Sequence, residues 1–410
     1  MCSLRHGSQA LPPEHATSPG DNDMSIRLSE EERMIQKTAR DFAVREIEPA
    51  AAEADREGIF DEDIYRGLAE LGFMGMTMPE EYGGVGFGNL CLAIALEEIS
   101  RVSPATAIAL SVHNSLANYI IHRWGSEDLR QRYLPRLTSG EMIGAYAITE
   151  PAAGSDVSAM TTSAVRDGDS YVINGSKIFI STGDRAGIIV VVARTDPAEK
   201  KKGLSAFAVE PGFDGFSIGK VEHKMGMKAS TTVELVFEDC RVPAANIIGE
   251  EGMGMQIALG SLDGGRIGIA AQSLGIAQTA LDEAVLFARE REQFGSRLID
   301  FQATQCKIAD MATDIEASRL LVYRAARLRD EGRPCSKESS MAKLFASRAA
   351  NRVAYDSLQI HGGVGYTEEF KIERFFRDAR VTEIYEGTSE IQQIVIARNV
   401  LEEYDRMFPA

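Results

Sequence analysis

The sequence has few basic residues for its number of acidic ones. Its 410 residues include 44 Lys and Arg against 61 Asp and Glu, and the formal net charge is −17. A chain of this charge can hardly assemble the basic patch that a nucleic-acid-binding face needs, so we expect no nucleic-acid partner. No apolar run approaches the length needed to cross a bilayer, so we expect no membrane partner either. An anionic ligand would have to be held by single arginines, backbone N–H groups and helix N-termini.

Cysteine is also scarce. The cysteines are scattered and show no CxxC spacing: Cys2, Cys91, Cys240, Cys306 and Cys335. This usage argues against a disulfide framework and against a metal site, and it is typical of reduced, mostly buried thiols. We therefore expect a cytoplasmic protein of the bacterial type that binds no metal.

The first residues lack the features of a targeting segment. Residues 1–25 are predicted to be a disordered tail, because they are rich in Pro, Gly, Ser and His and show no hydrophobic period. They have no apolar stretch typical of a secretory signal, and their acidic residues outnumber their one Arg, which makes a poor mitochondrial transit peptide. A mitochondrial matrix location is thus the less favoured alternative, and Met24 is a second candidate for the true start.

The rest of the chain changes character twice. Residues 26–145 show apolar residues at helical spacing after a capping box at Ser29–Glu32, and residues 146–250 contain short runs typical of strands. Residues 251–410 return to long helical stripes, as in 304–330. We predict an α+β multidomain protein with an N-terminal α-helical domain, a central β-domain of barrel or sandwich type and a C-terminal four-helix-bundle domain.

Two local patterns refine this prediction. Asn174-Gly175 separates the apolar runs 171–173 and 177–180, which predicts a hairpin with a two-residue turn. The glycines of Gly362–Gly365 follow helix-like sequence, and no alternating βαβ pattern is present. A Rossmann dinucleotide-binding fold is therefore excluded.

One carboxylate, Glu386, lies in an apolar stretch just before a predicted helix. Ser389 and Gln392 have capping-box spacing, and the apolar face of that helix is formed by Ile391, Ile394, Val395 and Val400. Partial desolvation favours the neutral carboxyl group and raises its pKa, which suits a general base that accepts a proton from carbon. Without further context, a Glu at such a junction is more often a simple helix cap.

Further segments change that balance when they are considered together. They are Tyr146–Asp156, Phe179–Thr182, Asp263–Ile267, Arg291–Gly295 with the following Phe301-Gln302, and Gln359–Gly363. With the Glu386 segment, they resemble the acyl-CoA dehydrogenase family from about Leu28 to Tyr404. The likeness is greatest to short-chain (butyryl-CoA) members, particularly in Asp263–Gln278 and Arg377–Gln392.

The resemblance implies a chemistry that explains the choice of residues. Forming a 2,3-double bond in an acyl thioester needs a base for the α-proton and an acceptor for the β-hydride, and no side chain accepts hydride, so FAD is implied. The family assigns the base to Glu386, and its backbone N–H is expected to polarise the thioester carbonyl together with a ribityl hydroxyl of FAD. Some family members place the base at the position of Gly265 instead, which this chain leaves without a carboxylate.

The resemblance also implies which residues bind FAD: Tyr146, Ala147, Ile148, Thr149, Gly154, Ser155, Phe179, Ile180, Ser181, Arg291, Gln302, Gln359, Ile360, His361, Gly362, Gly363, Thr388, Ser389 and Glu390. The family usually has Trp-Ile-Thr where this chain has Phe179-Ile180-Ser181, so the hydroxyl is kept while the ring that packs on the flavin is smaller. Without the resemblance, the Ser181 hydroxyl would be expected to satisfy local backbone and Arg291 to be a surface residue.

The implied substrate residues are Ser155, Asp263, Gly264, Gly265, Arg266 and Gly387. Arg266 can equally pair with Asp263 at i, i+3 on a helix surface, and both readings remain open. In the family, Arg291, Gln302 and Gln359–Gly363 reach the FAD of a neighbouring subunit, which implies a homotetramer or homodimer.

The implied activity is FAD-dependent oxidation of a short-chain acyl-CoA to the 2-enoyl-CoA in fatty-acid β-oxidation, with electrons passed to an electron-transfer flavoprotein. The alternatives are a branched-chain, aryl or dicarboxylic acyl-CoA dehydrogenase, or an acyl-CoA oxidase, of the same family. A non-enzymatic or nucleic-acid-binding relative that keeps FAD is opposed by the net charge and by the presence of Glu386.

Overall fold

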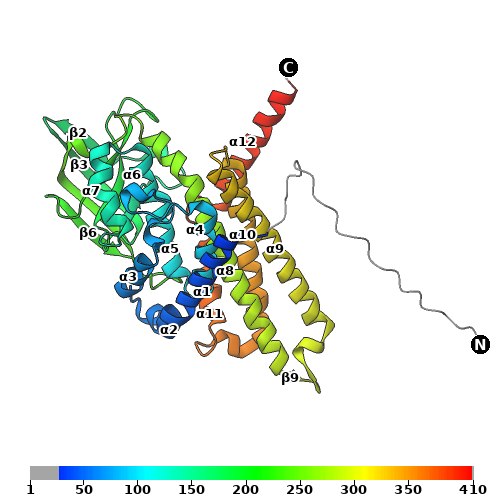
Figure 1. The fold of residues 1–410 in the computed structure, drawn as a ribbon. Coiled ribbons are helices and arrows are strands. Elements are labelled where there is room, and N and C mark those ends of the chain that lie inside the picture. Colours follow the sequence, from blue (N-terminus) through cyan, green and yellow to red (C-terminus); the bar gives the residue numbers. More distant parts are fainter. Residues whose placement is uncertain (1–26, 409–410) are drawn as a thin grey trace, which may run out of the picture.

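The computed structural model describes residues 27–408, so the predicted N-terminal tail lies outside the described residues. The described chain consists of an N-terminal helical region, a β-region and a C-terminal helical region, in chain order from blue through green to red in Figure 1. This agrees with the predicted α+β architecture. The division of the chain at about residues 145 and 250 stays a prediction.

The N-terminal region contains α1 (Glu30–Phe42), α2 (Glu48–Glu57), α3 (Glu62–Glu70), α4 (Gly88–Ser100), α5 (Pro104–Val112), α6 (Tyr119–Trp124) and α7 (Glu127–Thr138). The predicted capping box at its start is confirmed. The Ser29 hydroxyl accepts from the Glu32 N–H at 3.1 Å, and the Glu32 carboxylate accepts from the Ser29 N–H at 2.7 Å.

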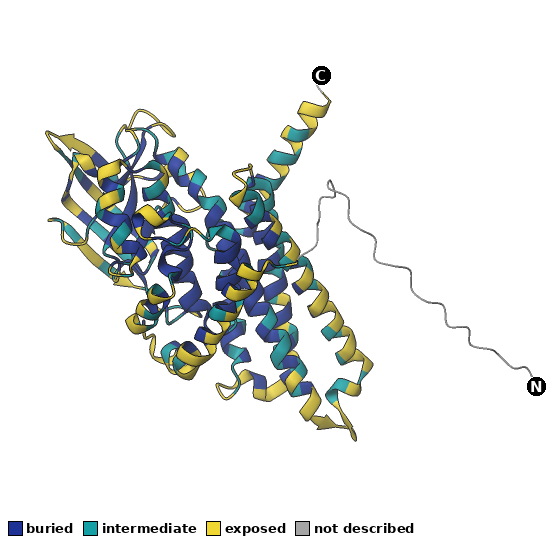
Figure 2. Cartoon of the chain, viewed as in Figure 1, coloured by how far each residue is buried: buried dark blue, intermediate teal, exposed yellow. Residues whose placement is uncertain are grey.

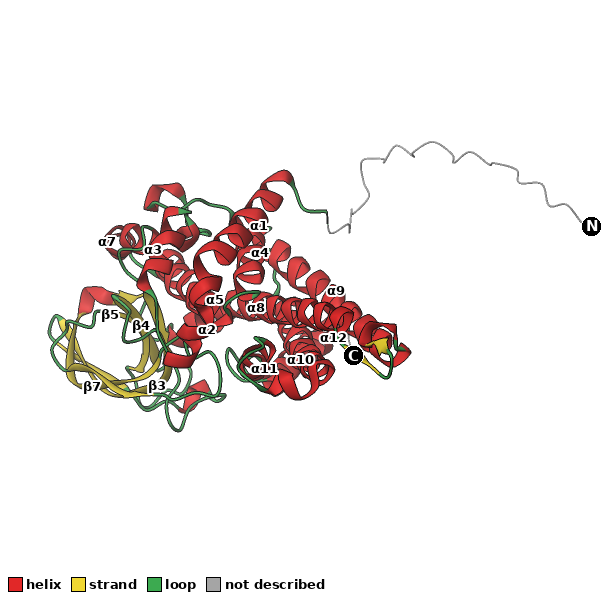
Figure 3. Ribbon diagram, turned by 90° about the horizontal axis from the view of Figure 1, so that it is seen from below, coloured by secondary structure: helices red, strands yellow, loops and turns green. Residues whose placement is uncertain are grey.

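The β-region contains β1 (Gly144–Ala147), β2 (Ser163–Asp167), β3 (Ser170–Ser181), β4 (Ile188–Arg194), β5 (Leu204–Val209), β6 (Phe216–Val221), β7 (Thr232–Pro243) and β8 (Ile247–Ile248). The strand order is β6-β7-β3-β2-β4-β5-β8, and β1 lies parallel to β4. Figure 3 shows these strands curving around one another at one end of the molecule, as the wall of a barrel does. A barrel-like β-domain is therefore present as predicted.

Strand β4 has consecutive apolar residues because both of its faces are buried against other parts of the protein. Ile188, Val190 and Val192 share a core with residues of α7, whereas Ile189 and Val191 pack inside the barrel-like sheet with residues of β3, β5 and β7. The β-region is thereby attached to the N-terminal helices through one continuous core.

The predicted hairpin at Asn174-Gly175 is wrong. β3 continues through these residues, and its pairing with β7 shifts register there, which is a β-bulge. Asn174 accepts a hydrogen bond from the Asp239 N–H at 2.8 Å, and a Cβ on Gly175 would lie 2.6 Å from the Thr162 hydroxyl oxygen. The two-residue turn lies instead at Gly168-Asp169, between β2 and β3.

The C-terminal region contains α8 (Gly254–Glu290), β9 (Glu292–Gln293), β10 (Ser296–Arg297), α9 (Gln302–Asp330), α10 (Ser336–His361), α11 (Ile372–Val381) and α12 (Ser389–Met407). The long helices α8, α9 and α10 pack on one another, and α11 and α12 pack against α10. Figure 2 shows the buried residues gathered where α4, α8 and α10 meet, while the end of α12 projects into solvent. Residues 264–277 of α8 are all buried.

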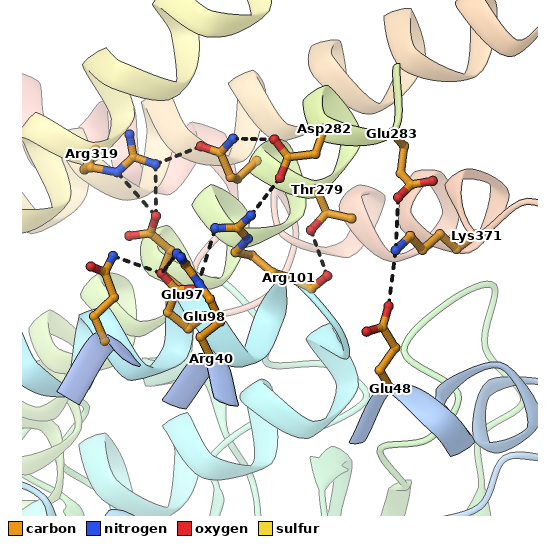
Figure 4. A network of polar contacts seen from close by, with 12 residues as sticks. Arg40, Glu48, Glu97, Glu98, Arg101, Thr279, Asp282, Glu283, Arg319 and Lys371 are labelled. Carbon is orange, nitrogen blue, oxygen red and sulfur yellow. Dashed lines mark hydrogen bonds and ion pairs between the residues drawn. The ribbon is translucent and has the colours of Figure 1, made fainter. Parts of the chain in front are cut away.

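Buried ion pairs attach the N-terminal helices to this bundle (Figure 4). Glu97 and Glu98 of α4 are almost fully buried. Arg319 of α9 lies 3.0 Å from Glu97, and Arg40 of α1 lies 2.7 Å from Glu98. The Glu97 pair joins α4 to α9, and Arg101, just after α4, lies 2.7 Å from Asp282 of α8. α8 also carries the segment from Asp263 to Ile267. No helix in residues 27–408 is long and apolar enough to cross a membrane.

Candidate active site

Glu386 lies in the loop between α11 and α12, with its carboxylate directed at Gly265 of α8. A Cβ built on Gly265 would lie 2.5 Å from Glu386 Oε2 and 3.0 Å from its Cδ. Only glycine leaves room for the carboxylate at this point of the helix. The two positions at which the family is expected to place its base are therefore brought together.

The environment of Glu386 shifts its acidity in the direction predicted from the sequence. Burial raises the pKa of Glu386 from its usual 4.5 to about 7, against the opposing effect of the positive charges on Arg266 and Lys343. A carboxyl group of this kind gains or loses its proton near neutral pH, which suits general-base catalysis.

Arg266 makes the ion pair of one of its two readings, and its role toward the substrate stays a prediction. Its guanidinium donates to Asp263 at 2.9 Å, as expected for an i, i+3 pair, and its charge also acts on Glu386. Arg266 is buried, and its Nε has no hydrogen-bond partner among the described residues. One donor thus remains open beside the base.

The capping box predicted at Ser389 and Gln392 is wrong, and α12 has a single N-cap hydrogen bond one residue earlier. Thr388, and not Ser389, caps α12 by accepting from the Ile391 N–H at 3.4 Å. The Ser389 hydroxyl donates instead to Glu383, and Gln392 donates to the carbonyl oxygens of Glu386 and Gly387 at 3.2 and 2.9 Å. Glu386 does not cap α12, so the simpler alternative for this residue is not what the structure shows.

The backbone of Glu386 is unusual. Its φ is +52°, in the left-handed region, and that of the following Gly387 is +88°. A non-glycine residue in this conformation is strained and is typically found at functional sites. The Glu386 N–H has no hydrogen-bond acceptor among residues 27–408, so it is free for a ligand.

The two predicted flavin segments of the β-region also lie together. The Ile178 N–H donates to the Thr149 carbonyl at 2.9 Å, which joins the loop after β1 to the end of β3. A second link is a buried ion pair, in which Lys177 of β3 lies 2.7 Å from Glu150. Lys177 also donates to the Ile148 carbonyl at 3.3 Å.

The end of β3 exposes the Phe179 ring to solvent, whereas Ile180 is buried. Phe179 has φ +58° and lies where the β3–β7 register is interrupted, and its ring is 60% exposed. The Ser181 hydroxyl makes no hydrogen bond to any described residue, so it does not satisfy local backbone. Gly154 has open space around the position of a Cβ, and Ser155 is exposed.

Tyr146 connects these segments with the base. Burial raises the pKa of Tyr146, and the nearby charge of Glu386 adds to this effect. Its buried hydroxyl has no hydrogen-bond partner within 3.5 Å among the described residues, although the Ser261 hydroxyl is near enough to lower the pKa of Tyr146. Glu386, Gly265, Arg266 and the loop after β1 therefore belong to one site.

Comparison with known proteins agrees with this arrangement. Three family models match in chain order: the acyl-CoA dehydrogenase N-terminal domain at residues 29–141, its middle domain at 145–240 and its C-terminal domain at 252–401. The chain belongs to the acyl-CoA dehydrogenase family. It is accordingly an oxidoreductase that acts on acyl-CoA.

Individual relatives cover nearly the whole chain. The acryloyl-CoA reductase (NADH) of Anaerotignum propionicum is 50% identical, over 92% of this chain and 96% of the relative. The mitochondrial short-chain specific acyl-CoA dehydrogenase of Homo sapiens is 48% identical, over 93% and 92%. The solved structure of butyryl-CoA dehydrogenase from Megasphaera elsdenii has a TM-score of 0.91 at 43% identity, covering 92% of this chain and 100% of that chain.

Part of the predicted FAD set lies far from Glu386 within this acyl-CoA dehydrogenase chain. Arg291 follows the end of α8, roughly 40 Å along the helix from Gly265 at 1.5 Å per residue. Gln302 begins α9 beside it, and Gln359–Gly363 lie at the end of α10, where His361 stacks on Phe287 at 4.4 Å. One protomer therefore does not bring these residues to the site.

The sequence prediction missed several polar residues that support the site. Lys343 on α10 is fully buried and donates to the Gly387 carbonyl at 2.7 Å. Its signal was available, because it is one lysine within the stripe of small buried residues Ser339, Ala342, Ala346, Ala350 and Val353. Glu150 and Lys177 are linked across the β-region, and no local pattern shows that link.

Proposed function

We propose that this member of the acyl-CoA dehydrogenase family is an FAD-dependent enzyme that converts a short-chain acyl-CoA to the 2-enoyl-CoA. Glu386 is its catalytic base. The observation that carries the proposal is the placement of the Glu386 carboxylate over Gly265, with a pKa near neutrality and with a strained backbone behind it.

The proposed role of each residue follows from its position. Glu386 accepts the proton from C2 of the acyl group. Its own N–H, which has no acceptor in the described part of the chain, donates to the thioester carbonyl and stabilises enolate charge. Arg266 keeps a positive charge close to the base, which limits the rise of its pKa. Ser155, Asp263, Gly264 and Gly387 are the further candidate substrate residues.

The residues present fit an FAD. Within residues 27–408 the buried Tyr146 hydroxyl has no hydrogen-bond partner within 3.5 Å, and the end of β3 offers the exposed Phe179 ring as an apolar surface and the Ser181 hydroxyl as a donor. The cofactor, when bound, supplies the acceptor for the hydride from C3, which no side chain can provide. The chain's own contribution is to hold the two β-region segments together through Lys177 and Glu150.

We further propose that the enzyme is a homo-oligomer, a tetramer or a dimer, in which Arg291 of one protomer serves the FAD of another. The β9–β10 hairpin carries Phe294, which is 96% exposed, at the far end of α8 from Glu386. A second exposed apolar surface lies on α12, with Ile394, Leu401, Tyr404, Met407 and Phe408 each more than half exposed. Surfaces of this kind support association.

Anaerobic titration of the purified flavoprotein with acyl-CoAs tests the function, because flavin bleaching reports binding and oxidation together. Butyryl-CoA is expected to bleach the flavin, and electron-transfer flavoprotein is expected to restore its colour. A protein that lacks flavin absorbance and gains none with added FAD would contradict the proposal. A cytoplasmic location stays a prediction from the sequence.

Reduction of a 2-enoyl-CoA is a second candidate activity. It is favoured by the 50% identity to the acryloyl-CoA reductase. The same site serves both directions, since the acid form of Glu386 can return the proton to C2. Adding NADH and acryloyl-CoA to the purified protein separates the two, because only a reductase system consumes NADH. Titration with branched-chain, aryl and dicarboxylic acyl-CoAs tests for the other dehydrogenase activities of the family. An oxygen-consumption assay tests for an acyl-CoA oxidase.

A further inference from the structure

The loop that carries Glu386 is held from two helices at the same point. Lys343 of α10 donates to the carbonyl oxygen of Gly387 at 2.7 Å. Gln392 of α12 donates to that oxygen at 2.9 Å and to the Glu386 carbonyl at 3.2 Å. Both carbonyl groups that follow the base are therefore fixed by buried side chains.

These contacts stabilise a backbone conformation that Glu386 would not adopt by itself. Its φ of +52° is strained, and φ for Gly387 is +88°. If the Gly387 carbonyl were released, the Glu386 backbone would relax toward an ordinary conformation. The carboxylate would then leave its position over Gly265, and the free N–H would turn with it.

Lys343 has no ion-pair partner among the described residues. Its side chain is fully buried, yet no carboxylate of the described residues lies within 4.0 Å of its ammonium group. Lys177, equally buried, has Glu150 at 2.7 Å. A buried ammonium group without an ion-pair partner is costly, so its presence needs another reason than packing.

The charge of Lys343 acts on the base itself. Burial lowers the pKa of Lys343 from its usual 10.5 to about 8, and the Glu386 carboxylate is the main influence opposing that change. Other charged or titratable groups around the pair come from the neighbouring elements: Arg266 and Asp263 on α8, Glu383 and Tyr385 in the loop after α11, Glu390 and Arg398 on α12, and Tyr146 on β1.

We propose that Lys343 is a positioning residue of the Glu386 base, which it supports together with Gln392. Its ammonium group holds the Gly387 carbonyl, and thereby the left-handed Glu386 backbone, and it keeps the ionised carboxylate stable over Gly265. The inference rests on the proposed function for its catalytic part, whereas the contact between Lys343 and the Glu386 loop stands independently of it.

The catalytic test compares Lys343→Met with Lys343→Arg, and with Lys337→Met as the matched control on the same helix. Lys337 pairs with Glu403 at 2.5 Å and makes no hydrogen bond to the Glu386 loop in the described part of the chain. K343M should slow flavin bleaching by butyryl-CoA about 100-fold, as expected for a misplaced reacting group. The butyryl-CoA concentration that gives half of the maximal bleaching rate should change little in K343M. K343R should recover part of the rate, and K337M should behave as the wild type.

The pH profile separates this role from a merely structural one. Removing the positive charge should raise the pKa of Glu386, so the acid limb of the bleaching rate should move to higher pH by about one unit. Loss of folding alone would lower the active fraction without moving that limb. If K343M does not fold, Lys343→Gln, which keeps a donor for Gly387 but no charge, replaces it. An unmoved limb in a folded variant overturns the proposal.

A double-mutant cycle in thermal unfolding needs no substrate. K343M and Glu386→Gln should be non-additive in their shifts of Tm, because Lys343 loses its electrostatic partner in E386Q. Additive shifts would overturn the proposed coupling. If none of the acyl-CoAs bleaches the flavin of the wild type, the proposed function fails. The double-mutant cycle still decides whether Lys343 acts on Glu386.

Discussion

Replacing Gly265 by Ala tests the position of the base more directly than replacing the base itself. The added Cβ would lie 2.5 Å from Glu386 Oε2, whereas an ordinary contact needs about 3.5 Å, so the carboxylate must move by about 1 Å. A displacement of that size costs about 10²-fold in rate, or about 2.7 kcal/mol of transition-state stabilisation.

Folding should survive this change. Ala is favoured over Gly in a helix interior by up to about 1 kcal/mol, which offsets part of the new crowding. Gly260→Ala is the matched control on α8, because its Cβ would meet only the ring edge of Trp124, at 3.1 Å. G260A should therefore keep a bleaching rate within a few-fold of the wild type.

Stopped-flow bleaching with butyryl-CoA is the assay, with flavin content and Tm measured on the same samples. The expected result is a folded, flavin-loaded G265A that bleaches about 100-fold more slowly than G260A. Bleaching of G265A at the wild-type rate would refute the reasoning, because the carboxylate could not then lie over Gly265 during the reaction.

Further predictions concern the base, the subunit contact and the substrate. Glu386→Gln should keep acyl-CoA binding while flavin reduction falls by about 10²–10⁴, and wild-type reduction would assign the base elsewhere. Because the pKa of Glu386 is raised in the folded state, the carboxyl stabilises the protein below about pH 4.5 and loses that contribution as the pH rises through about 7. The free energy of unfolding measured in urea should thus be about 1–2 kcal/mol higher for E386Q than for the wild type at pH 8, after allowance for the partial exposure of Glu386. At pH 4.5 the two values should not differ in this way. Arg291→Ala should weaken FAD retention and association together, which light scattering with and without excess FAD measures. Butyryl-CoA should bleach faster than octanoyl-CoA or palmitoyl-CoA, with a steep fall above about six to eight carbons, and faster isobutyryl-CoA oxidation would exclude straight-chain specificity.

The sequence predicted the order of helical and β-regions because that order depends on hydrophobic period, a local property. The Ser29–Glu32 capping box was correct for the same reason. Asn174-Gly175 failed because the dipeptide serves a β-bulge as well as a turn, and only the pairing with Asp239 on β7 decides between them. At α12, Thr388 and Ser389 are both good caps, so the sequence left the first helical residue uncertain by one.

Within the site, the residues that belong to a sequence motif were predictable, whereas the residues from other helices that hold them in place were not. The resemblance identified Glu386 and Gly265, and the structure brings them together. Lys343 lies 44 positions from Gly387 in the chain, so its contact follows only from the packing of α10 against the last loop. The distance between Glu386 and Arg291 is likewise a property of α8 as a straight helix, and it shows why part of the predicted set needs a second protomer.

Several departures from ordinary folding rules occur in the segments that form this site. Phe179, Thr182 and Glu386 have positive φ, Lys343 is buried without a carboxylate, and Glu386 has a pKa that makes its ionised form costly. Each feature lowers the stability of the protein, and stable packing elsewhere has to offset it. The buried ion pairs at Glu97 and Glu98 and the fully buried centre of α8 supply such packing. The rigid helices therefore hold a strained loop in place, and the strain keeps one carboxylate and one N–H available to the substrate.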